Sequence, residues 1–322
     1  MAGSPQQERM LPAALRPGDK VGIIAPAGFF YPDALQAGCA WLEGRGFVPV
    51  YLPSILDREV YFAGSTQRRL DEFHEMFSRS DVKAIICARG GYGCNYLLPQ
   101  IDLDLVRANR KIIVGCSDVT TLLTYLCDEA RMAVFHGPML NTDVRLDGVD
   151  EPSWRSALVS AESYRREFSA NEVQTIVPGE ASGMLYGGCL SLLCASLGTA
   201  YEITTGGTIL FIEDLAEPAF RIDRMLMHLK LAGKLDEVRA IIFGEMLDCG
   251  RNAGYPLQDV VKRVVGELGI PVAYGLKSGH VSSGNITLPF GVQATLKAGA
   301  GVSLSWEASV SKNAAVVAAH PS

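Results

Sequence analysis

The segment Gly115-Cys-Ser-Asp118 is the first place in the sequence where nucleophilic chemistry can be expected. It lies between an apolar run at 111–116 and a helical pattern from about 118 to 129. A serine at such a turn points out of the sheet edge, and backbone N–H groups at the helix start face any anion that develops there. The segment resembles a nucleophile elbow, although Val119 replaces the second glycine of the G-x-S-x-G pattern. A simpler interpretation, which the local sequence favours, is that Ser117 or Asp118 caps the helix.

Two later segments carry groups suited to acid–base chemistry. Phe211-Ile-Glu-Asp214 places Glu213 and Asp214 at the carboxyl end of an apolar run, where active-site acids of α/β folds often lie. A solvated loop or a cap for the following helix explains these two acids equally well. His280 lies in a Gly/Ser-rich loop, from which an imidazole can reach a neighbouring site. His136 ends another apolar run and is a competing candidate.

The glycine-rich turn Arg89-Gly-Gly-Tyr-Gly93 matches neither the G-x-G-x-x-G dinucleotide fingerprint nor a phosphate-binding loop ending in G-K-[ST]. It favours close approach of the backbone to a bound group, with exposed N–H donors. A metal site has little support, because the sequence has no H-E-x-x-H motif, no C-x-x-C pair and only scattered histidines. We therefore expect neither a metal nor an organic cofactor.

The elements that must position these residues alternate between strand and helix in the first half of the chain. Apolar runs at 20–26, 82–88, 111–116 and 133–138 predict buried strands, and the intervening patterns predict helices, among them 32–43 and 66–78. Strands that are apolar throughout are typical of a parallel sheet covered on both faces. The sequence thus predicts an N-terminal doubly wound, flavodoxin-like α/β domain over residues 1–145, with its active groups at the carboxyl ends of the strands.

The second half is organised differently. Residues 146–180 are polar, with one helical stretch near 152–165, and read as a linker or flap segment. A C-terminal α/β domain is expected over 181–322, with strands at 208–213 and 238–244. Its end, 286–306, alternates apolar residues with glycine-containing turns and predicts antiparallel hairpins.

Composition limits the class of protein. The chain has 322 residues, 48% of them hydrophobic, and a formal net charge of −6, which is ordinary for a globular protein of about two domains. The absence of a Lys/Arg-rich run argues against nucleic acid or an anionic membrane as a partner. No stretch is apolar enough for a membrane span or a secretory signal, and the eight cysteines suit a reducing compartment. We expect a cytoplasmic protein.

Taken in order, the motifs resemble those of the LD-carboxypeptidases, serine peptidases of the S66 type, which also include the microcin C immunity hydrolases. The resemblance runs from about Lys20 to Leu296. Cys116 and Cys189 depart from the pattern, the second at a position where relatives commonly carry Asn. The motifs that carry the resemblance are Ala25-Pro-Ala27, Arg89-Gly-Gly-Tyr-Gly93, Gly115-x-Ser-Asp118, His136-Gly-Pro138, Gly187-Gly188, Ile212-Glu-Asp214, Arg221-Ile-Asp-Arg224, Gly279-His280 and Leu288-Pro-x-Gly291.

The resemblance implies a Ser–His–Glu triad, which carries over onto Ser117, His280 and Glu213. In this scheme Glu213 holds the tautomer of His280, which takes the proton from Ser117 Oγ. The oxyanion would then be received by the Asp118 N–H and by a glycine N–H of the 89–93 turn, with Gly90 the better candidate.

The implied substrate is a cytoplasmic murein tetrapeptide, from which the enzyme releases the terminal D-Ala during peptidoglycan recycling. Such an exopeptidase needs a group that captures a terminal carboxylate, and Arg89 and Arg221 are candidates because a guanidinium binds this group in a bidentate manner. Each arginine is equally well explained as a structural ion-pair partner. Dimerisation is common in the resembled family, so a homodimer is expected.

Two alternative functions remain open. One is hydrolysis of an acyl-aminoacyl adenylate, as in microcin immunity, for which an aromatic residue should stack on the base. Trp154 and Tyr164, in the segment that could form a flap, are candidates. The other is a non-catalytic peptide- or sugar-binding module, since fold does not determine function. The joint presence of Ser117, Glu213 and His280 argues against the second alternative.

Overall fold

The N-terminal half folds as a mostly parallel sheet with helices on both faces. The computed structural model describes residues 9–144, 148–251 and 254–312. The sheet has the strand order β12-β5-β4-β3-β1-β2. The part β2-β1-β3-β4-β5 is parallel and has the order of the flavodoxin-like fold, as predicted. Its strands are β1 (Lys20–Ile24), β2 (Val48–Val50), β3 (Val82–Cys87), β4 (Ile112–Gly115) and β5 (Val134–His136).

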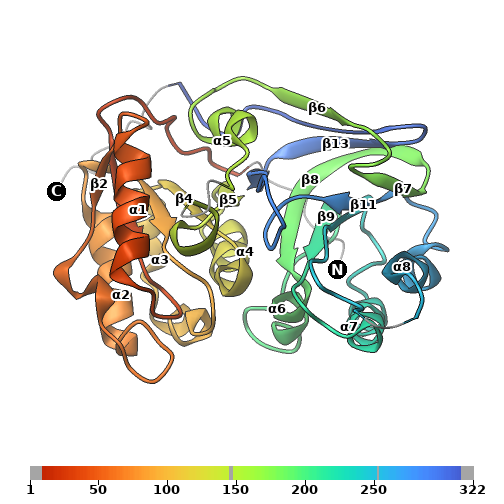
Figure 1. The fold of residues 1–322 in the computed structure, drawn as a ribbon, viewed down its shortest axis with the longest axis horizontal. Coiled ribbons are helices and arrows are strands. Elements are labelled where there is room, and N and C mark those ends of the chain that lie inside the picture. The colour runs from red at the N-terminus through yellow and green to blue at the C-terminus, as the bar shows by residue number, and fades with distance from the viewer. Residues whose placement is uncertain (1–8, 145–147, 252–253, 313–322) are drawn as a thin grey trace.

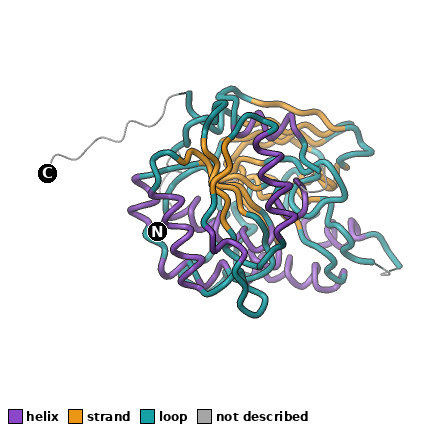
Figure 2. Tube along the Cα trace, turned by 60° about the vertical axis from the view of Figure 1, so that its left-hand side comes forward, coloured by secondary structure: helices purple, strands orange, loops and turns teal. Residues whose placement is uncertain are grey.

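Two hydrophobic clusters hold helices against the two faces of this sheet, and Figure 2 shows helices on the outside of the strands. The helices α1 (Pro32–Glu43) and α5 (Glu151–Leu158) pack on one face through Leu35, Leu42 and Trp154. The other face is covered by α2 (Thr66–Ser78), α3 (Leu103–Ala108) and α4 (Thr120–Glu129). Because successive side chains of a strand point to opposite faces, strands covered on both sides must be apolar throughout.

The second sheet has a parallel centre and antiparallel flanks, in the order β6-β14-β13-β8-β9-β10-β11-β7. The neighbours β8, β9, β10 and β11 are parallel, whereas β13, β14, β6 and β7 are antiparallel. The strands are β6 (Tyr164–Phe168), β7 (Gln174–Val177), β8 (Gly179–Cys189), β9 (Thr208–Glu213), β10 (Ala240–Gly244), β11 (Val272–Leu276), β13 (Gln293–Ala298) and β14 (Val302–Trp306). The helices α6 (Leu190–Ala195), α7 (Ala219–Leu231) and α8 (Leu257–Val265) lie below this sheet in Figure 1.

The C-terminal hairpins are only partly as expected. The strands β13 and β14 form an antiparallel hairpin in the second sheet. The preceding strand, β12 (Leu288–Phe290), instead crosses to the first sheet and pairs antiparallel with β5. Alternation of apolar residues indicates a strand but does not identify its partner. This crossing ties the loop that carries His280 to the N-terminal sheet.

The segment 146–180 contributes regular structure to both halves. Its helix α5 ends at Leu158, before the predicted end near residue 165, and β6 begins at Tyr164. The strand β6 is an edge strand whose exposed positions carry the charges of Arg165 and Glu167, which is why its sequence reads as a polar connection. The proposed division of the chain at residues 145 and 181 stays a prediction.

Candidate active site

Ser117 lies in the strained turn between β4 and α4. Its φ is +61°, a left-handed conformation that non-glycine residues seldom adopt. A one-turn helix, η4 (Ser117–Val119), begins at the serine and leads into α4. Nucleophile elbows hold their serine in such a strained strand-to-helix turn. The sequence matches the nucleophile-elbow motif only in part, but the backbone conformation of Ser117 is the one that such elbows have.

Glycines on two segments leave the space that this elbow needs. A Cβ at Gly90 would lie 2.6 Å from Ser117 Cβ and 2.8 Å from its Oγ. A Cβ at Gly115 would lie 2.6 Å from the Val119 side chain. In this chain Gly90 packs against the serine from a neighbouring turn, and Gly115 accommodates Val119. The second glycine of the G-x-S-x-G pattern is therefore not required.

Asp118 does not cap the helix, so the simpler interpretation of this residue is wrong. Its side chain is buried and accepts a hydrogen bond from the Cys94 N–H at 2.8 Å. No side-chain cap occurs at the start of η4 or α4. Burial raises the pKa of the Asp118 carboxyl, and the backbone hydrogen bonds partly offset this. The carboxyl group fastens the end of the glycine-rich turn, while the backbone N–H of Asp118 lies beside Gly90.

Charged side chains of α2 hold the two loops beside this turn. Arg69 is buried and donates from Nη1 to the carbonyls of Pro26 and Gly93, each at 2.8 Å. Glu72 is buried as well and accepts the Ala25 N–H at 2.7 Å. Gly28 N–H in turn donates to the Gly90 carbonyl at 2.9 Å. Sequence reasoning missed these side chains, because charges within a helical pattern usually indicate a solvated face.

Glu213 and His280 form a bonded pair at the end of β9. The carboxylate Oε2 accepts the His280 backbone N–H at 3.0 Å and its ring Nδ1 at 2.8 Å. Gly279, with φ +86°, permits this approach, because a Cβ there would lie 2.6 Å from Glu213 Cδ. Burial raises the pKa of Glu213, but the two neighbouring imidazoles outweigh it and hold the pKa below its usual range. Burial lowers the pKa of His280, but Glu213 raises it above its ordinary value.

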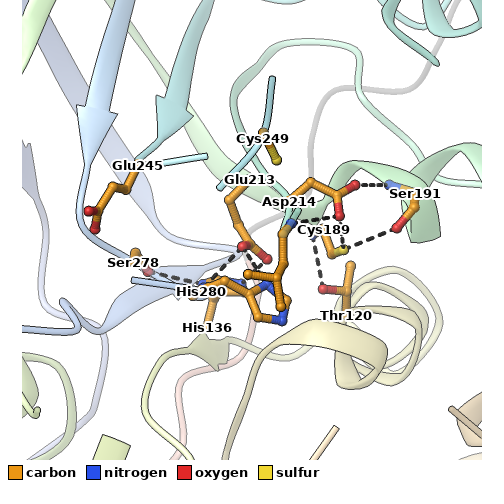
Figure 3. Close-up of polar contacts among 12 residues, drawn as sticks. Thr120, His136, Cys189, Ser191, Glu213, Asp214, Glu245, Cys249, Ser278 and His280 are labelled. Atoms are coloured by element: carbon orange, nitrogen blue, oxygen red, sulfur yellow. Dashed lines mark hydrogen bonds and ion pairs between the residues drawn. The ribbon is translucent and has the colours of Figure 1, made fainter. Parts of the chain in front are cut away.

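Asp214, the next residue, points away from this pair toward Ser191 and Cys189 (Figure 3). Its carboxylate accepts the Ser191 N–H at 2.9 Å, at the start of α6, and the Cys189 thiol lies 3.6 Å from its other oxygen. Of the two predicted acids, one therefore pairs with the histidine. The other binds an N–H in the first turn of α6 and does not cap the helix that follows it, α7, whose start has no side-chain cap.

Contacts between the halves bring the serine and the histidine to one region. The Cys189 N–H donates to Thr120 Oγ1 at 3.1 Å, three residues after Ser117, and Cys189 is the β-sheet partner of Glu213. Among the described residues, no hydrogen bond joins Ser117 to His280. Such catalytic bonds often form only when a substrate is bound.

Both halves of the chain match domains of one known family. Residues 21–137 match the LD-carboxypeptidase N-terminal domain, and residues 182–296 match the LD-carboxypeptidase C-terminal domain. The chain belongs to the LD-carboxypeptidase family. The family match confirms the expected enzyme class, a serine-type hydrolase, and the α/β fold that the sequence predicts.

Relatives of two kinds resemble this member of the LD-carboxypeptidase family. The probable murein peptide carboxypeptidase of Bacillus subtilis is 38% identical over 88% of this chain and 91% of its own length. The murein tetrapeptide carboxypeptidase of Pseudomonas aeruginosa is 31% identical over 86% of this chain and 93% of its own. The apo structure of the microcin C7 self-immunity protein MccF superposes with a TM-score of 0.84 and 27% identity, over 94% of this chain and 100% of MccF. Another MccF structure holds aspartyl sulfamoyl adenosine.

The two predicted carboxylate-binding arginines differ in their surroundings. Arg89 donates from Nη1 to the Phe29 carbonyl at 2.6 Å, next to the glycine-rich turn. Arg221 lies on α7, with its side chain 49% exposed, and pairs with Glu217 at 3.0 Å. In the described part of the chain, no carboxylate forms an ion pair with Arg89. Arg221 therefore has the structural partner that the simpler interpretation expects, whereas Arg89 directly precedes Gly90, which packs against Ser117.

The aromatic residues expected in a flap lie elsewhere. Trp154 is buried in the core, with its ring centroid 5.3 Å from that of Trp41. Tyr164 stacks on Trp306 at 4.5 Å, in the second sheet. An aromatic cluster that sequence reasoning missed flanks the glycine-rich turn instead, and its tyrosines are exposed; its members are Tyr61, Phe62, Tyr92 and Tyr96. Tyr92 belongs to the R-G-G-Y-G motif itself, which is the signal that could have found it.

The described residues include no helix with the length and apolar character that crossing a bilayer requires. Within the same ranges, His, Cys, Asp and Glu side chains form no group of three or more that could hold a metal ion.

Proposed function

We propose that this protein is a murein tetrapeptide carboxypeptidase that releases the terminal D-Ala through a Ser117–His280–Glu213 triad. The observation that carries the proposal is a serine in a strained strand-to-helix turn, in the same region as a buried glutamate that is bonded to a partly buried histidine. The curated relatives named as murein peptide carboxypeptidases support the substrate class. The cytoplasmic location and the homodimer stay predictions.

In the proposed mechanism, Glu213 fixes the orientation of His280 by accepting a hydrogen bond from its protonated Nδ1. The other ring nitrogen, Nε2, takes the proton from Ser117 Oγ as this oxygen attacks the scissile carbonyl. The Asp118 N–H and the Gly90 N–H stabilise the oxyanion. His280 then protonates the leaving D-Ala amine, and water resolves the acyl-enzyme. No step requires a cofactor.

The carboxylate of the terminal D-Ala requires a cationic partner, for which Arg89 and Arg221 are candidates. Arg89 is favoured by its place beside the glycine-rich turn and by the absence of an ion-pair partner in the described ranges. Replacing Arg89 with Ala is expected to reduce D-Ala release more than hydrolysis of an ester without that carboxylate. Arg221→Ala serves as the comparison, and an equal loss with both substrates would remove Arg89 from this role.

The deciding experiment measures D-Ala release from L-Ala-γ-D-Glu-meso-diaminopimelate-D-Ala by the wild type and by Ser117→Ala. Loss of the nucleophile is expected to reduce turnover by about 10,000-fold or more. Ser117→Ala keeps the Cβ at the positive φ and removes only the hydroxyl, so the variant should unfold at the same temperature as the wild type. Unchanged turnover in Ser117→Ala would refute the proposed nucleophile.

A second candidate function is hydrolysis of an acyl-aminoacyl adenylate. The exposed tyrosines around the glycine-rich turn favour it, because aromatic faces can stack on a base. MccF, which this chain resembles in structure, has been solved with aspartyl sulfamoyl adenosine. If the folded wild type releases no D-Ala but is stabilised against heat by that compound, this candidate replaces the first.

A further inference from the structure

A second histidine lies against the triad carboxylate and faces the oxygen that His280 does not bind. His136, at the end of β5, has no exposed surface, and its Nε2 lies 3.8 Å from Glu213 Oε1. Figure 3 shows Glu213 beside both imidazole rings. While Oε2 accepts two hydrogen bonds from His280, Oε1 faces His136. The two oxygens of one carboxylate are thus assigned to two different histidines.

Both facing atoms are buried polar atoms without a hydrogen-bond partner. This holds for His136 Nε2 and for Glu213 Oε1. A buried polar atom left without a partner typically costs about 1–3 kcal/mol, and more when it is charged. An approach of about 0.6 Å would bring the two atoms within hydrogen-bond distance and would satisfy both.

The other contacts of His136 decide which of its nitrogens carries the proton. Its Nδ1 lies 3.0 Å from the hydroxyl of Ser278, a residue that is also fully buried. A carboxylate only accepts hydrogen bonds, so Nε2 must be the protonated nitrogen if it is to bind Glu213. Nδ1 is then unprotonated and accepts from the Ser278 hydroxyl, which can donate.

Packing fixes the plane of the ring. His136 stacks on Phe290 with an interplanar angle of 25° and a centroid distance of 5.3 Å, and Phe211 contacts it at 5.2 Å. A Cβ at Gly279 would lie 2.8 Å from His136 Cε1. The ring therefore has little room to turn, and its Nε2 stays directed at Glu213.

We infer that His136 is a positioning residue of the active site: Ser278 holds it in the Nε2–H form, and it donates to Glu213 Oε1 so that the carboxylate stays ionised and aligned with His280. The inference rests on the proposed triad, because Glu213 must orient His280 for the contact to affect the reaction. No bond is made or broken at His136, whose proton remains on Nε2 throughout.

The first test reads the tautomer of His136 in the unmodified protein. In ¹⁵N-histidine-labelled wild type, the two ring nitrogens of a neutral imidazole have different chemical shifts according to which is protonated. We expect a protonated Nε2 and an unprotonated Nδ1, with the signals assigned by their loss in His136→Gln. A protonated Nδ1 with an unprotonated Nε2 would overturn the inference. This result does not depend on the substrate or on Ser117.

The second test compares His136→Phe with His136→Gln. Phenylalanine keeps the stacking but has no donor, whereas the glutamine amide can donate to Glu213. We expect His136→Phe to slow phosphonylation of Ser117 by a serine-directed phosphonate about 10- to 100-fold, the range found when outer partners of metal-bound histidines are removed. His136→Gln should recover most of the rate. His228→Phe, which alters an exposed histidine of α7, is the control.

The outcomes separate this inference from the function on which it rests. If the wild type is not labelled at Ser117, the proposed nucleophile fails, and the tautomer measurement still decides whether His136 faces Glu213 as a donor. If the wild type is labelled and His136→Phe reacts equally fast, His136 has no positioning role. Should His136→Phe not fold, Ser278→Ala removes the hydroxyl that sets the tautomer, and Ser309→Ala removes a buried hydroxyl elsewhere as its control.

Discussion

The two sides of the active site are built by different means. On the nucleophile side, Ser117 is strained, and the loops around it are held by charged side chains of α2 that bind backbone groups. On the acid–base side, Glu213 and His280 bind each other directly, and glycines permit the close packing. The first arrangement positions the backbone N–H groups beside Ser117, and the second raises the pKa of the His280 imidazole. Each side can therefore be damaged without disrupting the other.

A buried carboxylate lies on each side, and the pKa values of the two shift in opposite directions. Glu72 supports the nucleophile side, and burial raises its pKa to about 7, despite Arg68 and the Ala25 N–H. Glu213 supports the other side, and there the two imidazoles outweigh burial and lower the pKa. Depth in the core thus does not decide the charge of a carboxylate; its partners do.

The largest effect is expected from Glu213→Gln, which removes the charge on the acid–base side. A triad acid replaced by its amide lowers turnover by about 10,000-fold in the serine protease studied as a template. We expect a loss approaching this size in D-Ala release. Glu245→Gln, which alters a carboxylate that accepts the Ser282 N–H, is the matched control.

The same variant should also shift the pH profile. His280 acts as a base only when neutral, so kcat/KM rises as the pH passes its pKa. Since Glu213 raises the pKa of His280, Glu213→Gln should move the acidic limb of the residual activity to lower pH. An unmoved limb would mean that the Glu213–His280 contact does not control the base.

Gly90→Ala tests the nucleophile side. The new methyl group would lie 2.6 Å from Ser117 Cβ and 3.3 Å from the Asp118 nitrogen, so the serine or the turn must shift. Loss of one oxyanion donor lowers the rate by about 100- to 1000-fold, and we expect a drop in kcat of this size. The pH profile should be unchanged, because His280 and Glu213 are untouched. Gly299→Ala, where no atom lies within 4 Å of the new Cβ, is the control.

Asp118→Ala should have a smaller effect on the same side. The backbone N–H of residue 118 remains, but the Cys94 N–H loses its partner and the glycine-rich turn is less firmly held. We expect kcat to fall about tenfold, in line with the loss of roughly one hydrogen bond's positioning energy. Asp104→Ala, which removes an exposed carboxylate of α3, should leave kcat unchanged. A loss as large as that of Gly90→Ala would assign the carboxylate a direct role.

Much of this arrangement could be predicted from the sequence, because the signals are local. The helices α1 and α2 have the bounds that the periodicity predicts, 32–43 and 66–78. The strand order follows from alternating apolar strands and helices, which favour a doubly wound parallel sheet. Ser117 and Glu213 stand at strand ends, where such a sheet places its active groups.

What the sequence could not supply depends on contacts between distant segments. Nothing local shows that β12 crosses to the first sheet or that Arg69 binds carbonyls of two loops. His136 reads as a competitor of His280, whereas in the fold it faces the other oxygen of the same carboxylate. The helix-cap interpretation of Asp118 was wrong for a related reason, since its partner, Cys94, comes from another turn.

Glu72→Gln is expected to have the smallest effect on activity. Its effect on the pH dependence of stability should distinguish the two sides of the site. The pKa of Glu72 is raised in the folded state, so the folded protein binds more protons than the unfolded chain between about pH 4.5 and 7. Its contribution therefore favours folding at low pH and is lost as the pH rises through this window. The unfolding free energy of Glu72→Gln minus that of the wild type, both measured in urea, should therefore increase between pH 5 and pH 8. We expect an increase on the order of 3 kcal/mol.

Glu75→Gln, on the exposed face of the same helix, should show no such change. Glu213 has the opposite sign: its pKa is lowered, so its contribution is present above the unfolded pKa and lost on acidification. Relative to the wild type, Glu213→Gln should accordingly become more stable as the pH falls. Glu72→Gln should instead become more stable relative to the wild type as the pH rises. Parallel slopes for the two variants would show that the two sides of the site hold their carboxylates in the same way.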